Sequence, residues 1–269
     1  MLAIDLGCGN RKSAGAYGAD LVALPPVDAA INLKKYPLPF AADSFDRIVL
    51  NDVIEHVPET LEFMEELHRI ARPGATIEIS VINWNTIFTA MDPTHVRNFT
   101  ANTFDFFGGR EGRNYYTHAR FEVASVIKGY DARWRRWVRS ERLLDWFGLH
   151  LNNVLKSLDF KLVAVKTGAA APAPATFADA FRCPHCVASG GGDRGRLRAV
   201  RADWLICEDA GCGRKYPVHA ELPILLHGEG ARWIATPVEN LPSPPPGRVH
   251  RAGPEDFPTV FRHDVVPAA

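Results

Sequence analysis

Four of the five cysteines lie in two short groups in the C-terminal third of the chain. Cys183 and Cys186 form the first group, and Cys207 and Cys212 form the second. Thiolates on two short chelating turns are ligands that a tetrahedral zinc ion prefers. We therefore predict a structural zinc site with these four ligands. Iron held by four thiolates is an alternative, and a disulfide framework is another, although the chain looks intracellular.

Glycines near the N-terminus form a second group with chemical meaning. The apolar run 2–6 is typical of a buried parallel strand, and it ends in a turn that contains Gly7 and Gly9. Glycines let the backbone approach a ligand closely, and ligands of open α/β sheets bind at the carboxyl ends of strands. Asp20, in the next predicted strand, can accept hydrogen bonds from both hydroxyls of a ribose. The pattern indicates a nucleotide-type cofactor, and Lys12 at the third glycine position disfavours NAD.

Two histidines follow predicted strands and are candidate catalytic residues. His56 comes after strand 46–51, and His95 lies in segment 92–100, after strand 75–82. An unperturbed histidine titrates near neutrality, so either side chain can act as a base. Each also has a structural interpretation, in which the histidine only positions its loop. Tyr115, Tyr116 and His118 are weaker candidates.

The remaining pattern predicts the elements that position these groups. The predicted strands cover residues 2–6, 18–22, 29–33, 46–51, 75–82, 121–127 and 161–166, and the predicted helices cover 59–71 and 140–158. Strands that alternate with helices favour an α/β fold with a parallel sheet covered on both faces. Residues 83–120 form a long polar and aromatic connection, which is usually functional or carries small elements of its own.

Composition divides the chain into four parts. Residues 1–167 form the predicted α/β domain, and 168–180 form an Ala/Pro-rich linker. Residues 181–230 form the four-cysteine module, and the Pro-rich tail 231–269 is expected to be irregular. A module this small needs a staple such as a metal ion to fold.

Net charge excludes little, because Lys plus Arg and Asp plus Glu both total 31. The strongest local run, residues 133–139, interleaves arginine with tryptophan. It suits phosphate contact and base stacking, or an anionic membrane surface, or an exposed helix whose tryptophans pack inward. No apolar run approaches the roughly 20 residues that span a bilayer. We expect a cytoplasmic protein that is not an integral membrane protein.

Several motifs in chain order resemble those of class I S-adenosylmethionine (SAM)-dependent methyltransferases, of the branch called type 11. The matching segments are Asp5-Leu6-Gly7-Cys8-Gly9, Gly18-Ala19-Asp20, Asn32-Leu33, residues 37–46, residues 51–57 and residues 67–74. The resemblance covers about residues 1–167. It implies a Rossmann-like methyltransferase sheet, mostly parallel, with the last strand antiparallel, and it implies SAM as the cofactor.

The same resemblance implies roles for individual residues. The glycines would pass under the methionine part of SAM, Asp20 would hold the ribose, Asn32 would lie at the adenine, and Asp52 would close over the methionine end. The implied cofactor-binding residues are Asp5, Gly7, Gly9, Asn10, Asp20, Leu21, Asn32, Leu33, Asn51 and Asp52. Asn32 departs from the pattern, which usually has Asp, so we expect weaker binding there.

A second departure concerns the cover of the cofactor. The family normally begins with a helix over the cofactor, and the matched region starts at the first strand instead. We expect residues 83–120 or the C-terminal module to take over this role.

The cysteine module resembles the small zinc ribbons that activate tRNA, ribosomal RNA and release-factor methyltransferases. The matching segments are Cys183-Pro184-His185-Cys186, Trp204-Leu205-Ile206-Cys207, residues 212–218 and residues 221–226. The second cysteine pair is wider than the common form. In that family the ribbon docks on the methyltransferase and adds strand pairing, so the resemblance implies an intramolecular contact. Delivery of the substrate by the ribbon is the alternative.

The hypothesis with most support is a SAM-dependent methyltransferase for a small-molecule or metabolite-type acceptor, with structural Zn²⁺ in a ribbon that stabilises the enzyme. One alternative is a methyltransferase of RNA or of a translation protein. Another is a SAM-binding scaffold without catalysis, which Asn32 and the absent helix motivate.

Overall fold

The computed structural model describes residues 1–108, 116–168, 171–189 and 193–246. The chain falls into two compact units. Unit 1 combines residues 1–45 with residues 170–269, and unit 2 contains residues 46–169. The predicted boundaries at residues 167 and 180 were drawn from composition, and they remain predictions.

Unit 1 begins with three short parallel strands, β1 (Ala3–Leu6), β2 (Tyr17–Asp20) and β3 (Ala29–Ala30). The pairing of β2 places Gly18 opposite Asp5, and the pairing of β3 places Ala30 opposite Asp20. β1 is buried along its whole length, as its apolar run predicts. No helix lies within residues 1–45, so the expected helical cover of both sheet faces is wrong for this part of the chain.

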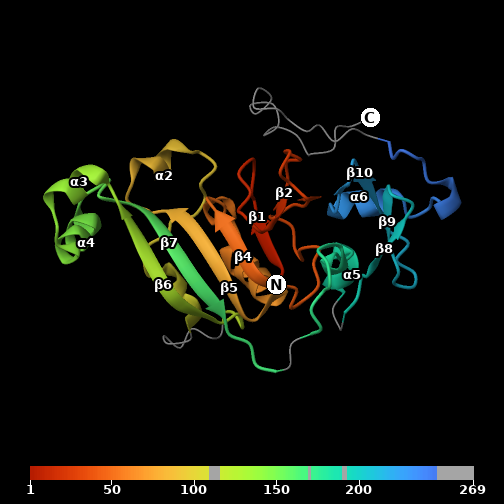
Figure 1. Ribbon diagram of the computed structural model, residues 1–269, viewed down its shortest axis with the longest axis horizontal. Helices are drawn as coiled ribbons and strands as arrows, with labels where there is room; N and C mark the ends of the chain where they lie inside the picture. Colours follow the sequence, from red (N-terminus) through yellow and green to blue (C-terminus); the bar gives the residue numbers. More distant parts are fainter. Residues whose placement is uncertain (109–115, 169–170, 190–192, 247–269) are drawn as a thin grey trace. The chain divides into compact units, whose positions relative to one another are not determined.

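The cysteine module in unit 1 contains the short helix α5 (Pro184–Ala188) and an antiparallel sheet (Figure 1). Its strands are β8 (Leu197–Val200), β9 (Trp204–Cys207), β10 (Lys215–His219) and β11 (Leu222–Pro223), in the order β11-β10-β9-β8. The single turn η3 (Ala178–Ala180) precedes the first cysteine.

The module continues the first sheet within unit 1. Ile224 forms a parallel bridge with Ala30, and the Leu225 amide donates to the Ala30 carbonyl at 3.0 Å. Leu222 and Ile224 are buried in one apolar cluster with Leu24 and other residues of 8–30. Apolar side chains of the module therefore fill space beside β3.

The end of the module and the segment after it pack against the cysteine module. They form α6 (His227–Arg232) and the turn η4 (Val238–Asn240). Leu241 is buried in a cluster with Trp204, and the Trp204 indole donates to the Pro242 carbonyl at 2.9 Å. From Pro237 to residue 246 the chain is irregular apart from the single turn η4, and residues 247–269 lie outside the described residues.

Unit 2 carries the long strands. β4 (Phe45–Asn51) begins at the unit boundary, and α1 (Thr60–Ile70) leads into β5 (Ala71–Ile82). β6 (Phe121–Tyr130) and β7 (Leu155–Ala164) follow, and β7 pairs antiparallel with both β5 and β6. α1 buries Phe63, Met64, Leu67 and Ile70, which gives it an apolar face at helical spacing.

The connections of unit 2 carry short elements of their own, including the long connection 83–120 between β5 and β6. These elements are the turn η1 (Ile54–His56), α2 (Ile87–Met91) and η2 (Thr103–Gly108). α3 (Ala132–Trp137) and α4 (Glu141–His150) lie beyond one end of β6 (Figure 1). Trp137 is 81% exposed, so the expectation that the tryptophans of this segment pack inward is wrong for it.

The predicted helix 140–158 is also partly wrong, because α4 ends at His150 and β7 begins at Leu155. Asn153 takes a positive φ of 63° between them, a conformation that ends a helix. Pairing of Ser157 with Ile82 then holds the following residues in the sheet.

The strand order is β3-β2-β1 in unit 1 and β4-β5-β7-β6 in unit 2. The fold is Rossmann-like, with a mostly parallel sheet and an antiparallel β7 near one edge. Among the described helices, none combines the length and apolar character needed to span a bilayer.

Candidate functional site

The glycine loop after β1 leaves a buried acceptor without a partner. Asp5 is fully buried, and its Oδ2 accepts a hydrogen bond from the Ser13 amide at 2.7 Å. Its Oδ1 is buried and has no hydrogen-bond partner among the described residues. Gly7 and Gly9 have φ values of 74° and 52°, and a Cβ added to Gly9 would meet nothing within 4 Å. A buried unpaired acceptor beside an open glycine turn suits a ligand that carries a donor group.

Asp20 joins this loop to the end of β2. Its Oδ2 accepts from the Gly9 amide at 2.9 Å, and its Oδ1 accepts from the Val22 amide at 3.0 Å. Burial raises the pKa of this carboxyl group. Each carboxylate oxygen has a second lone pair, so Asp20 can hold the loop and still accept from ribose hydroxyls. The anchoring contact was missed from the sequence, because backbone amides carry no residue-type signal.

The other predicted cofactor residues of unit 1 have less defined positions. Asn32 Oδ1 accepts a hydrogen bond from the Lys34 amide at 2.9 Å, which closes a local turn. Leu21 and Leu33 are half-buried, and Asn10 is exposed. The structure brings Asp5, Gly9 and Asp20 into one loop cluster, and the roles of these other residues remain predictions.

Cys8, the cysteine within the glycine loop, is a packing residue. Burial raises the pKa of its thiol to about 12, so it stays protonated near neutrality. A Cβ on Gly18 would come within 2.7 Å of the Cys8 sulfur. The small residue at position 18 therefore makes room for this thiol.

In unit 2 the end of β4 carries two predicted cofactor residues. Asn51 and Asp52 are both exposed, and Asp52 has a positive φ of 53°. The Asp52 amide donates to the Ser80 carbonyl at 3.0 Å, which fixes this turn against β5. Their role toward the methionine end of a cofactor remains a prediction.

The two candidate histidines lie together, with an acid that the sequence did not single out. Ligating atoms of Glu55, His56 and His95 lie within 4.8 Å of one another, and the two imidazole centroids are 4.8 Å apart. The Val96 amide donates to the Glu55 carbonyl at 2.9 Å, which ties the segment after β5 to the turn after β4. Tyr116 and His118 are exposed and outside this cluster, and Tyr115 is outside the described residues.

Glu55 is the unusual member of this cluster. The residue is 2% exposed, and both carboxylate oxygens are buried without a hydrogen bond of normal geometry among the described residues. Burial raises its pKa to about 7, and this rise exceeds the opposing effect of the nearby backbone amides of Glu55 and Ile82. A sequence signal existed, because Glu55 directly precedes a candidate histidine.

The four cysteines come together in unit 1. All are buried, and their sulfurs lie within 4.8 Å of one another. The sulfur distances are 3.8 Å for Cys183–Cys212 and 3.6 Å for Cys186–Cys207. Tetrahedral bonds of about 2.3 Å to zinc would place sulfurs about 3.8 Å apart. The donor set and its spacing therefore fit a zinc ion.

Outer groups surround this cluster with hydrogen-bond donors. The Tyr216 hydroxyl lies 3.1 Å from the Cys183 sulfur, and Arg214 donates to the Cys212 sulfur at 3.7 Å. Gly211 and Gly213 have φ values of 78° and 65° on either side of Cys212. Such donors orient metal-bound thiolates and offset their charge.

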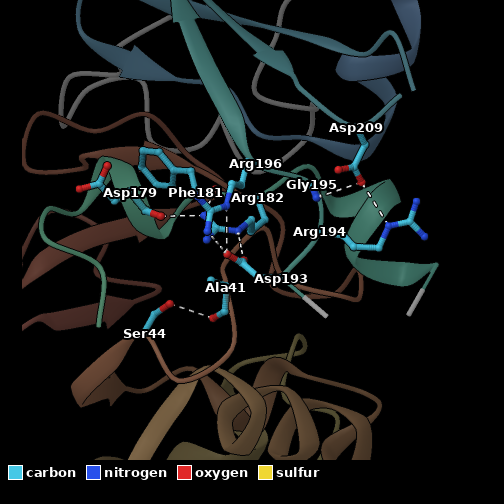
Figure 2. A network of polar contacts seen from close by, with 10 residues as sticks. All are labelled: Ala41, Ser44, Asp179, Phe181, Arg182, Asp193, Arg194, Gly195, Arg196 and Asp209. Atoms are coloured by element: carbon cyan, nitrogen blue, oxygen red, sulfur yellow. Dashed lines mark hydrogen bonds and ion pairs between the residues drawn. The ribbon is translucent and has the colours of Figure 1, made fainter. Parts of the chain in front are cut away.

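An arginine network holds the first cysteine turn (Figure 2). The buried Arg182 donates to Asp193 at 2.7 Å and to the carbonyls of Asp179 and Phe181. The Cys183 amide donates to the Gly195 carbonyl at 2.7 Å. The network fixes the backbone on both sides of the contact between Cys183 and Gly195.

The strand order, the antiparallel β7 and the glycine turn after β1 define a Rossmann-like methyltransferase fold. Residues 3–165 match the family described as "Methyltransferase domain". The chain therefore belongs to the methyltransferase domain family.

Relatives carry similar names. The chain is 31% identical over 125 residues to a "Probable S-adenosylmethionine-dependent methyltransferase" of Mycolicibacterium smegmatis, across 36% of this chain and 46% of that protein. It is 25% identical over 150 residues to an uncharacterized methyltransferase of Mycobacterium leprae, across 49% and 56%. The chain thus spans about half the length of the curated relatives that it matches.

Solved structures are more distant. The YcgJ protein of Bacillus subtilis is 12% identical with a TM-score of 0.41, over 61% of this chain and 92% of that chain. A Haloferax volcanii complex between the Trm112 methyltransferase activator and a putative methyltransferase is 16% identical with a TM-score of 0.40, over 61% and 83%.

Proposed function

We propose that this protein transfers a methyl group from SAM to a small-molecule or metabolite-type acceptor. SAM, when bound, supplies an electrophilic methyl group on a sulfonium that leaves readily. The protein has to bind this donor and orient the acceptor against it, so catalysis is mainly positioning. Family membership supports the class of reaction.

The glycine loop carries this proposal. The unpaired Oδ1 of Asp5 suits the donor of an ammonium group, and the open turn at Gly9 leaves room for the cofactor. Asp20 has lone pairs available for ribose hydroxyls. The residues proposed to complete the site are Asn10, Leu21, Asn32, Leu33, Asn51 and Asp52.

His56 and His95 are the proposed residues that act on the acceptor. A histidine that takes a proton is needed only if the acceptor loses one near the transition state. The contacts of His56 Nδ1 with the Thr94 hydroxyl and of His95 Nδ1 with the Thr89 carbonyl leave Nε2 of each neutral ring to accept a proton.

We further propose that the four cysteines hold structural Zn²⁺ in a zinc ribbon that stabilises the enzyme within one chain. The sulfur spacing supports the metal. The bridge between Ile224 and Ala30, with the apolar cluster around Leu24, supports stabilisation of the neighbouring strands. Four thiolates leave no coordination position for water, as in structural sites.

An RNA acceptor is the second candidate, and one observation favours it. Arg133, Arg135 and Trp137 of α3 are exposed, and Arg136 lies over the Trp137 ring, a combination that suits phosphates and bases. Methyl transfer from radiolabelled SAM to separate metabolite and RNA fractions of a cell extract decides between these acceptors. Labelled metabolites support our proposal, and labelled RNA replaces it with the second candidate.

Calorimetric titration with SAM tests the cofactor site. Asp20→Ala should weaken binding by about 1–3 kcal/mol, because buried donors of ligand and loop lose their acceptor. Asp20→Asn keeps the size and shape of the side chain, so it tests the same role with less risk of misfolding. Since burial raises the pKa of Asp20, affinity should also fall as pH is lowered toward that pKa, when the carboxyl group gains a proton.

The matched control is Asp28→Asn. Asp28 also accepts a backbone amide, from Gly18, and it pairs with Lys12 at 2.6 Å. This change should leave SAM affinity nearly unaltered. Equal affinity of wild type and both Asp20 variants would refute the ribose assignment, and SAM binding without any labelled acceptor would favour the non-catalytic scaffold.

A further inference from the structure

The geometry of unit 2 points to a second metal site, in which Glu55, His56 and His95 bind one divalent ion of the zinc class. We propose this site in addition to the four-cysteine site, from which it differs in every ligand. Two imidazoles and one carboxylate are a ligand set that zinc uses where chemistry occurs.

The hydrogen bonds of His56 fix which nitrogen faces the metal. The Thr94 hydroxyl donates to Asp92 Oδ1 at 2.6 Å, because a carboxylate can only accept. Its oxygen therefore accepts from His56 Nδ1, at 2.9 Å, and the Thr94 carbonyl lies 3.3 Å from the same nitrogen. Nδ1 thus carries the hydrogen, and Nε2 carries the lone pair that a metal needs.

His95 is oriented in the same way. Its Nδ1 lies 3.1 Å from the Thr89 carbonyl, which can only accept. Nε2 is again the nitrogen with the lone pair. A histidine whose other ring nitrogen donates to a backbone carbonyl is the usual arrangement at metal sites.

Glu55 provides evidence for a metal that does not depend on the hydrogen bonds of the two histidines. A buried carboxylate without hydrogen bonds of normal geometry is costly, unless a cation or a proton compensates it. In their neutral form both histidines present a lone pair on Nε2, and Asp92 Oδ2 lies 3.9 Å from the Nε2 of His95. A divalent ion would compensate the carboxylate and use both Nε2 atoms at once.

The spacing requires a small adjustment on binding. The ligand atoms lie within 4.8 Å, whereas bonds of about 2.1 Å would bring them to about 3.4 Å apart. The His56 ring is partly exposed and can rotate to supply most of this contraction, whereas the His95 side chain is only 7% exposed.

Three protein ligands would leave the fourth coordination position of the metal open, whereas the four thiolates of the cysteine site fill all four positions. Metals lower the pKa of a bound hydroxyl group. The metal would then replace a histidine base, because an acceptor oxygen or thiol bound to it would lose its proton to water before it takes the methyl group from SAM. This role rests on the proposed methyl transfer, whereas binding of the ion does not.

Counting metal on the full chain tests the site. Wild type should bind two zinc ions per chain, measured by elemental analysis and by calorimetric titration with ZnCl₂ after the four-cysteine site is filled. Glu55→Gln and His95→Gln should each weaken the second site by more than about 100-fold, beyond the 10–100-fold loss typical of an outer partner. The matched control is His150→Gln, because His150 is an exposed histidine on α4. This variant should still bind two zinc ions per chain.

A spectroscopic test on wild type avoids any effect of substitutions on folding. The second equivalent of Co²⁺ should add visible d–d bands without the near-ultraviolet charge-transfer bands of cobalt–thiolate bonds. One metal per chain, sulfur bands in the second equivalent, or an unchanged second site in both variants would overturn the proposal. SAM titration in the same samples shows separately whether the methyltransferase proposal stands.

Discussion

Two side-chain clusters bring together groups that hold metals, and they differ in how they are built. The four-cysteine cluster takes its ligands from two short turns and surrounds them with donors from Tyr216 and Arg214. The Glu55–His56–His95 cluster joins two segments through backbone hydrogen bonds and leaves a buried carboxylate uncompensated. The first arrangement favours a closed structural site, and the second favours an open site that can exchange a ligand.

The largest effect should come from breaking the cysteine cluster with Cys183→Ser. Structural zinc contributes about 10–16 kcal/mol to small metal domains, so loss of one thiolate should release the ion and unfold the module. The bridge between Ile224 and Ala30 should then break as well. Elemental analysis and thermal unfolding measure both effects.

Cys8→Ala is the matched control for this change. Cys8 is buried but lies outside the metal cluster, so its removal should leave the zinc content unaltered. Equal zinc content and equal stability of Cys183→Ser and wild type would show that the cluster is not a metal site. A first domain that stays fully stable and active after zinc loss would instead support substrate delivery by the module.

A smaller effect is expected from Tyr216→Phe, which removes one outer donor. Burial raises the pKa of Tyr216, so its hydroxyl stays protonated and donates to the Cys183 sulfur. Loss of this bond should weaken zinc binding 10–100-fold and lower the free energy of unfolding by about 1 kcal/mol. Competition with a chromophoric chelator gives the affinity, and urea unfolding gives the stability.

Tyr17→Phe serves as the comparison for that variant. The ring of Tyr17 stacks on the ring of Phe177, and the two centroids are 4.3 Å apart. This stacking does not need the Tyr17 hydroxyl. Equal zinc affinity in the two variants would mean that Tyr216 does not tune the cluster.

The difference between the clusters also explains what the sequence could predict. The cysteine spacing and the glycine turn are local patterns, and periodicity located the strands of the sheet. Glu55 was missed because its neighbour His95 is brought close by hydrogen bonds between distant segments. The beginning of β7 was missed because residues 155–158 fit a helical pattern, and only pairing with β5 selects the strand.

The smallest effect should follow from Thr94→Val, which changes an outer partner of the second cluster. The Thr94 hydroxyl links Asp92 to His56 Nδ1. Without it, His56 Nδ1 keeps the weaker contact to the Thr94 carbonyl, so the Nδ1–H tautomer should be less favoured. We expect the stability to fall by about 0.5–1 kcal/mol, as for other exposed hydrogen bonds.

Two measurements separate this ordering role from a general loss of stability. Nitrogen chemical shifts of the imidazoles report the tautomer of His56, and zinc titration should show a 10–100-fold weaker second site. Thr100→Val, on the same segment but bonded to Thr103, should change neither measurement. If both variants behave alike, Thr94 does not order His56. The second cluster would then lack at His56 the outer support that the cysteine cluster has, while His95 would keep its contact to the Thr89 carbonyl.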